Sequence, residues 1–167
     1  MLGLGIWYST KKTDKTMVNN MEKLEMEKII SGLLTVNGCD PEKDTYVDIT
    51  RLSRRLGFKV VNAELKKDEE GFIVIAPSYV NLESDFGNKV IVVNNKMGFK
   101  WKRFIIARQF AHFVLHYKIG SVYLHKENKK VEKGTEEKEA SYFAAALLMP
   151  RASFSLKYKK CKQSGLF

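Results

Sequence analysis

The sequence contains little cysteine, little proline and no long apolar run. Its two cysteines, Cys39 and Cys161, lie far apart and show none of the spacings of a metal-binding or disulfide-rich domain. They indicate a reducing compartment, although a disulfide between them is left open. No apolar segment reaches the roughly 20 residues that span a bilayer. The short apolar N-terminus has no basic residues before it, unlike a secretory signal. We therefore expect a cytoplasmic protein with no membrane partner.

Acidic residues are also in the minority. The 167 residues include 29 Lys and Arg against 19 Asp and Glu, which gives a net charge of +10. Such a charge suits an acidic protein partner, a nucleic-acid-binding protein partner, or nucleic acid itself. The lysines are scattered, and no basic motif interleaved with aromatic residues accompanies them. The pattern favours an ordinary solvated surface, with direct nucleic-acid binding as the minority interpretation.

Hydrophobic patterning predicts an α+β fold in which a small mixed sheet packs on buried helices. A hydrophobic content of 44% suffices for a core without disulfides or metal. Residues 1–20 are expected to form a flexible tail and residues 21–167 a single domain. Periodicity and capping residues predict helices over 21–35, 48–56, 100–117 and 136–149. β-Branched runs predict strands over 58–65, 72–76 and 89–94, while residues 118–135 are expected to form a mobile, charged connection.

The predicted helix over 100–117 carries a polar stripe on an otherwise apolar surface. Arg108, His112 and His116 recur every four residues, with Gln109 beside them. In a zinc-peptidase helix of the H-E-x-x-H type, two histidines four residues apart bind the ion, and the glutamate deprotonates the bound water. Here Arg108 occupies the first histidine position, Gln109 the glutamate position and His112 the second histidine position. Because an unpaired buried charge is costly, we expect the stripe to face a cleft or a polar partner.

Together with the segment that follows, this helix resembles the ImmA/IrrE family of zinc metallopeptidases. The family pattern is an H-E-x-x-H-x-x-L-H helix followed by E-x-E-A-N-x-F-A-A-x-L-L-M-P, and residues 137–150 read E-K-E-A-S-Y-F-A-A-A-L-L-M-P. The similarity covers about residues 45–150 and implies a minimal zincin-like, thermolysin-type fold. It also implies that the second and third metal ligands fall on His112 and Glu139. Since the sequence ends seventeen residues after Pro150, we expect a member shortened at its C-terminus.

Two departures from the family pattern fall on the chemical centre. A guanidinium keeps its proton at accessible pH and repels a dication, so Arg108 is no zinc ligand. An amide accepts no proton from water, so Gln109 is no general base. We therefore expect no catalytic residue at these positions and no bound cofactor. One hypothesis places an Arg108–Glu139 ion pair where the zinc would be.

A displaced zinc site is the alternative to that ion pair. His112 and His116 are themselves an i, i+4 histidine pair, to which Glu139 or Glu137 would add a third ligand. The position where such a site would need its base is a phenylalanine, and His125 is interpreted as a surface residue. In either case we expect a polar cluster at the cleft, formed by Arg108, Gln109, His112, His116 and Glu139.

These observations favour a pseudopeptidase that acts by binding a protein partner. Because active relatives cleave or engage repressors of mobile elements, the resemblance implies a regulator or inhibitor encoded on a phage or other mobile element. Two alternatives stay open. One is a zinc metallopeptidase with the displaced site, and the other is a basic nucleic-acid-binding protein.

Overall fold

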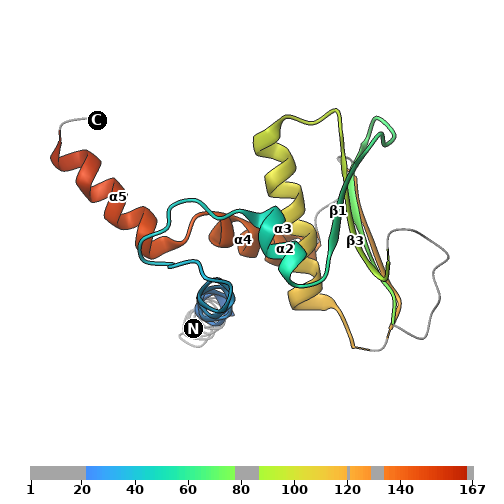
Figure 1. Cartoon of the computed structure of the whole chain (residues 1–167), viewed down its shortest axis with the longest axis horizontal. Helices are drawn as coiled ribbons and strands as arrows, with labels where there is room; N and C mark the ends of the chain where they lie inside the picture. Colours follow the sequence, from blue (N-terminus) through green and yellow to red (C-terminus); the bar gives the residue numbers. More distant parts are fainter. Residues whose placement is uncertain (1–21, 78–86, 120, 129–133, 165–167) are drawn as a thin grey trace, which may run out of the picture.

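The architecture is α+β, with helices packed against a four-stranded mixed sheet (Figure 1). The computed structural model describes residues 22–77, 87–119, 121–128 and 134–164. The predicted tail at residues 1–20 lies outside these ranges. Within them, none of the helices combines the length and the apolar character needed to cross a bilayer. The predicted fold class, a small mixed sheet on buried helices in a zincin-like domain, is confirmed.

The strands of the sheet lie in the order β1-β3-β2-β4. β1 (Lys59–Ala63) runs parallel to β3 (Lys89–Asn94), and β2 (Glu69–Ile75) runs antiparallel to β3. These strands coincide closely with the β-branched runs of the sequence. The reason is that residues such as Ile73 and Ile91 place their side chains in the core, where β-branched residues pack well.

β4 (Tyr123–Asn128) pairs antiparallel with the other edge of β2. The sequence predicted a mobile connection over residues 118–135, and this was wrong for the residues of β4; residues 120 and 129–133 lie outside the described residues. The strand is rich in polar residues, and its burial alternates with a period of two that does not follow hydrophobicity. Tyr123 and His125 are partly buried, whereas Leu124 and Lys126 between and after them are exposed. This alternation directs His125 toward the helices.

The helices are residues 22–36, α2 (Ile49–Arg55), α3 (Phe99–His116), α4 (Thr135–Leu148) and α5 (Arg151–Gln163). The first four agree with the predicted helices to within one or two residues at each end. α2 begins after Asp48, whose carboxylate accepts from the backbone N–H of Arg51 at 3.0 Å. α5 follows Pro150 and was not predicted. It contributes one buried residue, Ser153, to the fold.

α3 is the central helix of the structure. It lies between the sheet and α4, and α2 packs against it as well (Figure 1). As a result its residues 105–112 are buried consecutively, on every side of the helix. This confirms the prediction of a buried helix, and it means that the polar residues in this segment must find partners inside the protein.

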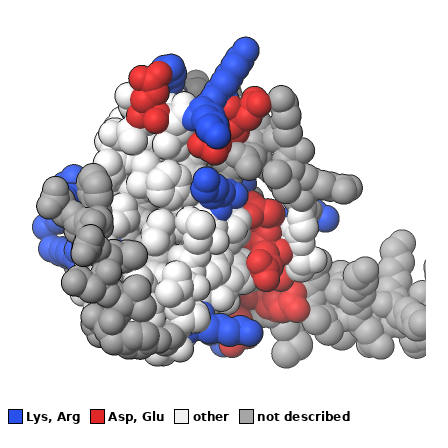
Figure 2. Space-filling view, turned by 90° about the vertical axis from the view of Figure 1, so that its right-hand side faces the viewer, with Lys and Arg blue, Asp and Glu red and all other residues white. Residues whose placement is uncertain are grey.

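The opposite face of the sheet is mostly uncharged. Figure 2, which looks onto the molecule from the right-hand side of Figure 1, shows this face with acidic side chains gathered along one side of it. Val90 and Val92 of β3 belong to this face and are nevertheless buried.

Gly71 allows α3 to approach the sheet. A Cβ atom at this position would lie 2.7 Å from Cγ2 of Ile105 and 2.7 Å from the carbonyl oxygen of Val92. Because the second contact is backbone, Gly71→Ala must displace β2 or β3, and we expect it to lower the free energy of unfolding by about 2 kcal/mol. Chemical denaturation measures this loss. Gly32→Ala is the control, since no heavy atom of the described residues outside its own helical backbone lies within 4 Å of its added Cβ; a loss as large in the control would contradict the steric explanation.

Candidate functional site

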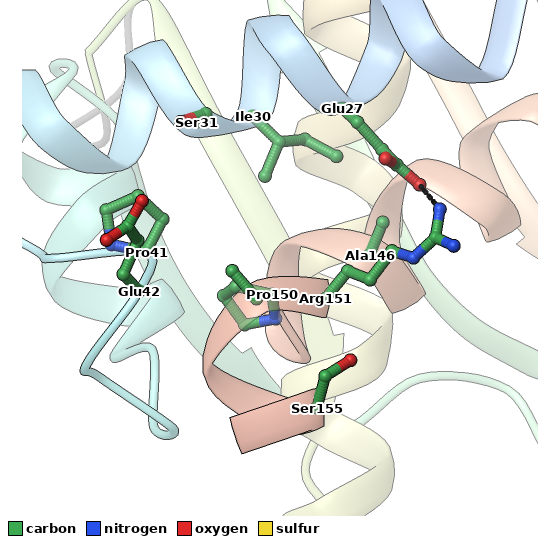
Figure 3. A pocket seen from close by; sticks show the side chains of 10 residues that line it. Glu27, Ile30, Ser31, Pro41, Glu42, Ala146, Pro150, Arg151 and Ser155 are labelled. Carbon is green, nitrogen blue, oxygen red and sulfur yellow. Dashed lines mark ion pairs between the residues drawn. The ribbon is translucent and has the colours of Figure 1, made fainter. Parts of the chain in front are cut away.

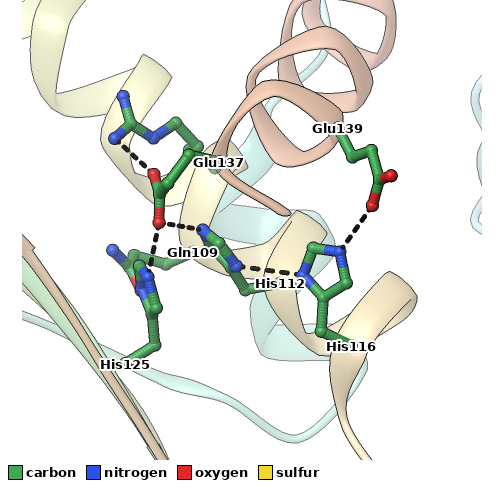
Figure 4. Close-up of polar contacts among 7 residues, drawn as sticks. Gln109, His112, His116, His125, Glu137 and Glu139 are labelled. Atoms are coloured by element: carbon green, nitrogen blue, oxygen red, sulfur yellow. Dashed lines mark hydrogen bonds and ion pairs between the residues drawn. The ribbon is translucent and has the colours of Figure 1, made fainter. Parts of the chain in front are cut away.

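Polar side chains from three elements meet beside the beginning of α4 (Figure 4). The structure brings together all five residues of the cluster expected from the sequence and adds two more, Glu137 and His125. α3 supplies Arg108, Gln109, His112 and His116, α4 supplies Glu137 and Glu139, and β4 supplies His125.

Glu137 is the centre of the cluster. Its Oε2 accepts from Nη2 of Arg108 at 2.9 Å, and its Oε1 lies 2.6 Å from Nε2 of His125. The Arg108 side chain is only 4% exposed and that of Glu137 19%, so this is a largely buried ion pair. The hypothesis that Arg108 pairs with Glu139 was wrong, because the carboxylate that Arg108 contacts is that of Glu137. Glu137 lies in the first turn of α4, where the helix dipole also favours a negative charge.

Glu139 belongs to a second chain of contacts. Its Oε2 lies 3.1 Å from Nε2 of His116, and Nδ1 of His116 lies 3.1 Å from Nδ1 of His112 (Figure 4). If both imidazoles are neutral, one arrangement joins a donor to an acceptor at each contact. His112 Nδ1–H then donates to His116, whose Nε2–H donates to Glu139. The Nε2 atom of His112 is consequently left with a lone pair.

His112 itself is completely buried and held in the neutral form. Burial lowers the pKa of His112 to about 3, with smaller contributions from the two neighbouring imidazoles and from Arg108. Its Nε2 lies 3.3 Å from Oε1 of Glu137 but has no hydrogen-bond partner with acceptable geometry. In this arrangement two hydrogen-bond acceptors, Nε2 of His112 and Oε1 of Glu137, therefore face each other in the interior.

His125 was interpreted as a surface residue, and this was wrong. Its ring stacks on that of His112 with centroids 3.7 Å apart, and its Nδ1 lies 3.4 Å from Oε1 of Gln109. Its side chain is 19% exposed. The local sequence does not place it inward, because the apolar neighbours Val122 and Leu124 occupy the exposed positions of this strand's alternation.

The standard zinc site of an H-E-x-x-H helix does not fit these residues. The first histidine position is Arg108, whose guanidinium has no lone pair for a metal and contacts Glu137 instead. The glutamate position is Gln109, whose carbonyl oxygen faces His125. α3 therefore supplies neither the paired imidazoles nor the general base of that motif.

A separate pocket lies at the other end of α4, between the helix at residues 22–36 and the start of α5 (Figure 3). Its volume is about 440 Å³. Within its lining, Arg151 approaches Glu27 at 3.9 Å, and Glu27 also accepts from the hydroxyl of Tyr142. Among the described residues that line it there is no histidine or cysteine. The cluster around Glu137 is therefore the better candidate for a functional site.

Comparisons with known proteins agree with this description. No curated protein matches the chain. The family model of the IrrE N-terminal-like domain, peptidase M78, matches residues 54–163, which is more than half of the chain and includes both helices of the cluster. This match confirms the resemblance to the ImmA/IrrE family. The chain therefore belongs to the IrrE N-terminal-like family of metallopeptidase-like domains.

Proposed function

We propose that this protein is a pseudopeptidase of the ImmA/IrrE type that acts by binding a protein partner. The observation that carries the proposal is the arrangement of Arg108 and Gln109 at the start of the peptidase motif. Arg108 forms a buried ion pair with Glu137, and the Gln109 carbonyl faces His125. With a guanidinium at the first histidine position and an amide at the glutamate position, the helix keeps the position of a peptidase helix but lacks its first metal ligand and its general base.

The binding role is supported by α5. Phe154, Leu156 and Tyr158 are each at least half exposed on this helix, although large apolar side chains are usually buried. The helix also carries basic residues without an acidic one, namely Arg151, Lys157, Lys159, Lys160 and Lys162. This combination suits an acidic protein surface that contains apolar side chains. By analogy with the family, the protein is a regulator or inhibitor encoded on a phage or other mobile element.

Peptidase activity tests the first half of the proposal. We expect zinc-treated wild-type protein to cleave an unfolded polypeptide such as casein no faster than the Gln109→Ala variant does. The Arg108→His/Gln109→Glu variant, which restores the ligand and the base, should exceed both by about 100-fold or more. Mass spectrometry of new peptide termini measures the rates. Zinc-dependent cleavage by the wild type that Gln109→Ala abolishes would show that the centre is active.

Partner capture tests the second half. We expect immobilised protein to retain an acidic protein from an extract of the source cells, and the purified pair to bind again in isolation. Phe154→Ala/Tyr158→Ala should weaken that binding at least about tenfold, because both rings are exposed for contact. The same variant should change the free energy of unfolding by less than about 0.5 kcal/mol. Retention of nucleic acid instead, with steep salt dependence, would favour the nucleic-acid alternative.

A further inference from the structure

We propose that Nε2 of His112, Nε2 of His125 and Oε1 of Glu137 form a binding site for a divalent transition metal such as zinc. One ligand atom from each of the three residues lies within 4.8 Å of the others, and Oε1 of Glu137 is 3.3 Å from Nε2 of His112 and 2.6 Å from Nε2 of His125. The residues come from α3, β4 and α4. Two imidazoles and one carboxylate are a ligand set that Zn²⁺ binds readily, with water at the fourth position. The site differs from the family's standard one, because its additional histidine comes from a strand rather than from the peptidase helix.

The first argument is the buried lone pair of His112. With neutral imidazoles, the contacts through His116 to Glu139 place the Nδ1 proton of His112 toward His116, so that Nε2 faces Glu137 without a donor between them among the described residues. An unsatisfied polar atom in a fully buried side chain is costly. A cation held by this nitrogen and by the Glu137 oxygen removes that cost.

The second argument is the support around the ligands. Metal-bound histidines usually donate their other N–H to a carbonyl, a carboxylate or a similar acceptor. His125 has the carbonyl oxygen of Gln109 at its Nδ1, and His112 has the His116–Glu139 chain at its Nδ1. In this arrangement Gln109 orients a ligand, which gives a function to a residue that is unsuited to act as a base.

The third argument concerns charge. Arg108 contacts Oε2 of Glu137 and leaves Oε1 directed toward the two histidines. The carboxylates of Glu137 and Glu139 outnumber the one guanidinium, so with the neutral imidazoles of a metal-bound state the groups around the ion carry a net negative charge. A dication is therefore compatible with Arg108 nearby.

One contact must lengthen when metal binds. Nε2 of His125 and Oε1 of Glu137 are 2.6 Å apart, which is the distance of a short charge-assisted hydrogen bond. Ligand atoms around a tetrahedral zinc ion lie about 3.3 Å apart, given metal–ligand bonds of about 2.0–2.1 Å. Metal binding would thus release the proton between these two atoms to solvent, and the ion would join β4 to α3 and α4.

Zinc titration of the full chain by calorimetry tests the site. We expect stoichiometric binding that His125→Ala weakens at least about 100-fold, since one of three protein ligands is lost. Glu139→Gln should weaken binding only about tenfold, as an outer partner. Lys126→Ala, an exposed neighbour on β4, should have no effect. Binding that survives His125→Ala but is abolished by Glu139→Gln would instead support the set His112, His116 and Glu139.

Nitrogen NMR of the wild-type histidines gives a second test that does not depend on the folding of a variant. Zinc should shift the Nε2 resonances of His112 and His125 while leaving Nε2 of His116 protonated. Absence of any zinc-induced shift, or coordination of His116, would overturn the proposal. Both measurements report metal binding alone. Their outcome is therefore separate from the peptidase assay and the partner-capture experiment, which test the proposed function.

Discussion

Replacing Glu137 by alanine is expected to lower the free energy of unfolding by about 3 kcal/mol. The substitution removes the carboxylate that Nη2 of Arg108 contacts at 2.9 Å and leaves the buried guanidinium with its charge uncompensated by that group. It also removes the acceptor of the 2.6 Å contact with His125, which holds β4 against the helices. Urea denaturation of the metal-free protein measures the loss.

Two variants separate the ion pair from other effects of the change. Glu136→Ala alters the neighbouring residue, which is acidic, exposed and in the same helical turn, and should cost less than about 1 kcal/mol. Arg108→Met/Glu137→Leu replaces both charges with apolar groups and should recover at least about half of the loss. A double variant as unstable as Glu137→Ala would show that the ion pair is not the cause.

Phe110→Ala is expected to lower the free energy of unfolding by about 4 kcal/mol. Phe110 is completely buried in the middle of α3, and its ring meets that of Phe58 edge to face with centroids 6.2 Å apart. Phe58 lies between α2 and β1, so the deletion leaves a cavity where three elements meet. Edge-to-face aromatic pairs add to the cost of the lost apolar surface.

Phe99→Ala is the matched control, because Phe99 begins the same helix but is 69% exposed. Its loss should change stability by no more than about 0.5 kcal/mol. Thermal or chemical denaturation of both variants makes the comparison. Similar losses at the two positions would mean that the burial of α3 is not what stabilises the fold.

The fold was largely predictable because its core elements combine strong periodicity with clear ends. β3 coincides with the predicted strand at residues 89–94, and α3 with the predicted buried helix to within one residue at each end. β4 was missed because its residues are mainly polar and its alternation of burial, which positions His125, does not follow hydrophobicity: Leu124 is exposed. The β-propensity of a residue describes how well it fits a half-buried strand. In β4 the hydrogen-bonded pairing with β2 determines the structure instead.

The exact carboxylate in the cluster was harder to predict. Residues 137 and 139 are about 200° apart around a helix, so only one of them can face a given neighbour, and the rotation of α4 about its axis determines which. The apolar pattern does not decide between them. Glu137 precedes the buried Ala140 by three residues, but Glu139 likewise precedes the buried Phe143 by four, so both lie beside buried positions. The spacing of the family motif alone drew attention to Glu139.

The central claim is that this peptidase frame binds without cutting, and the intact mass of the captured partner tests it most directly. The purified partner is incubated with zinc-treated wild-type protein and then weighed by mass spectrometry, with the Gln109→Ala variant as control. We predict full-length partner in both samples, still in complex with the protein. Fragments that form with the wild type, disappear with a chelator and are absent with Gln109→Ala would contradict the account.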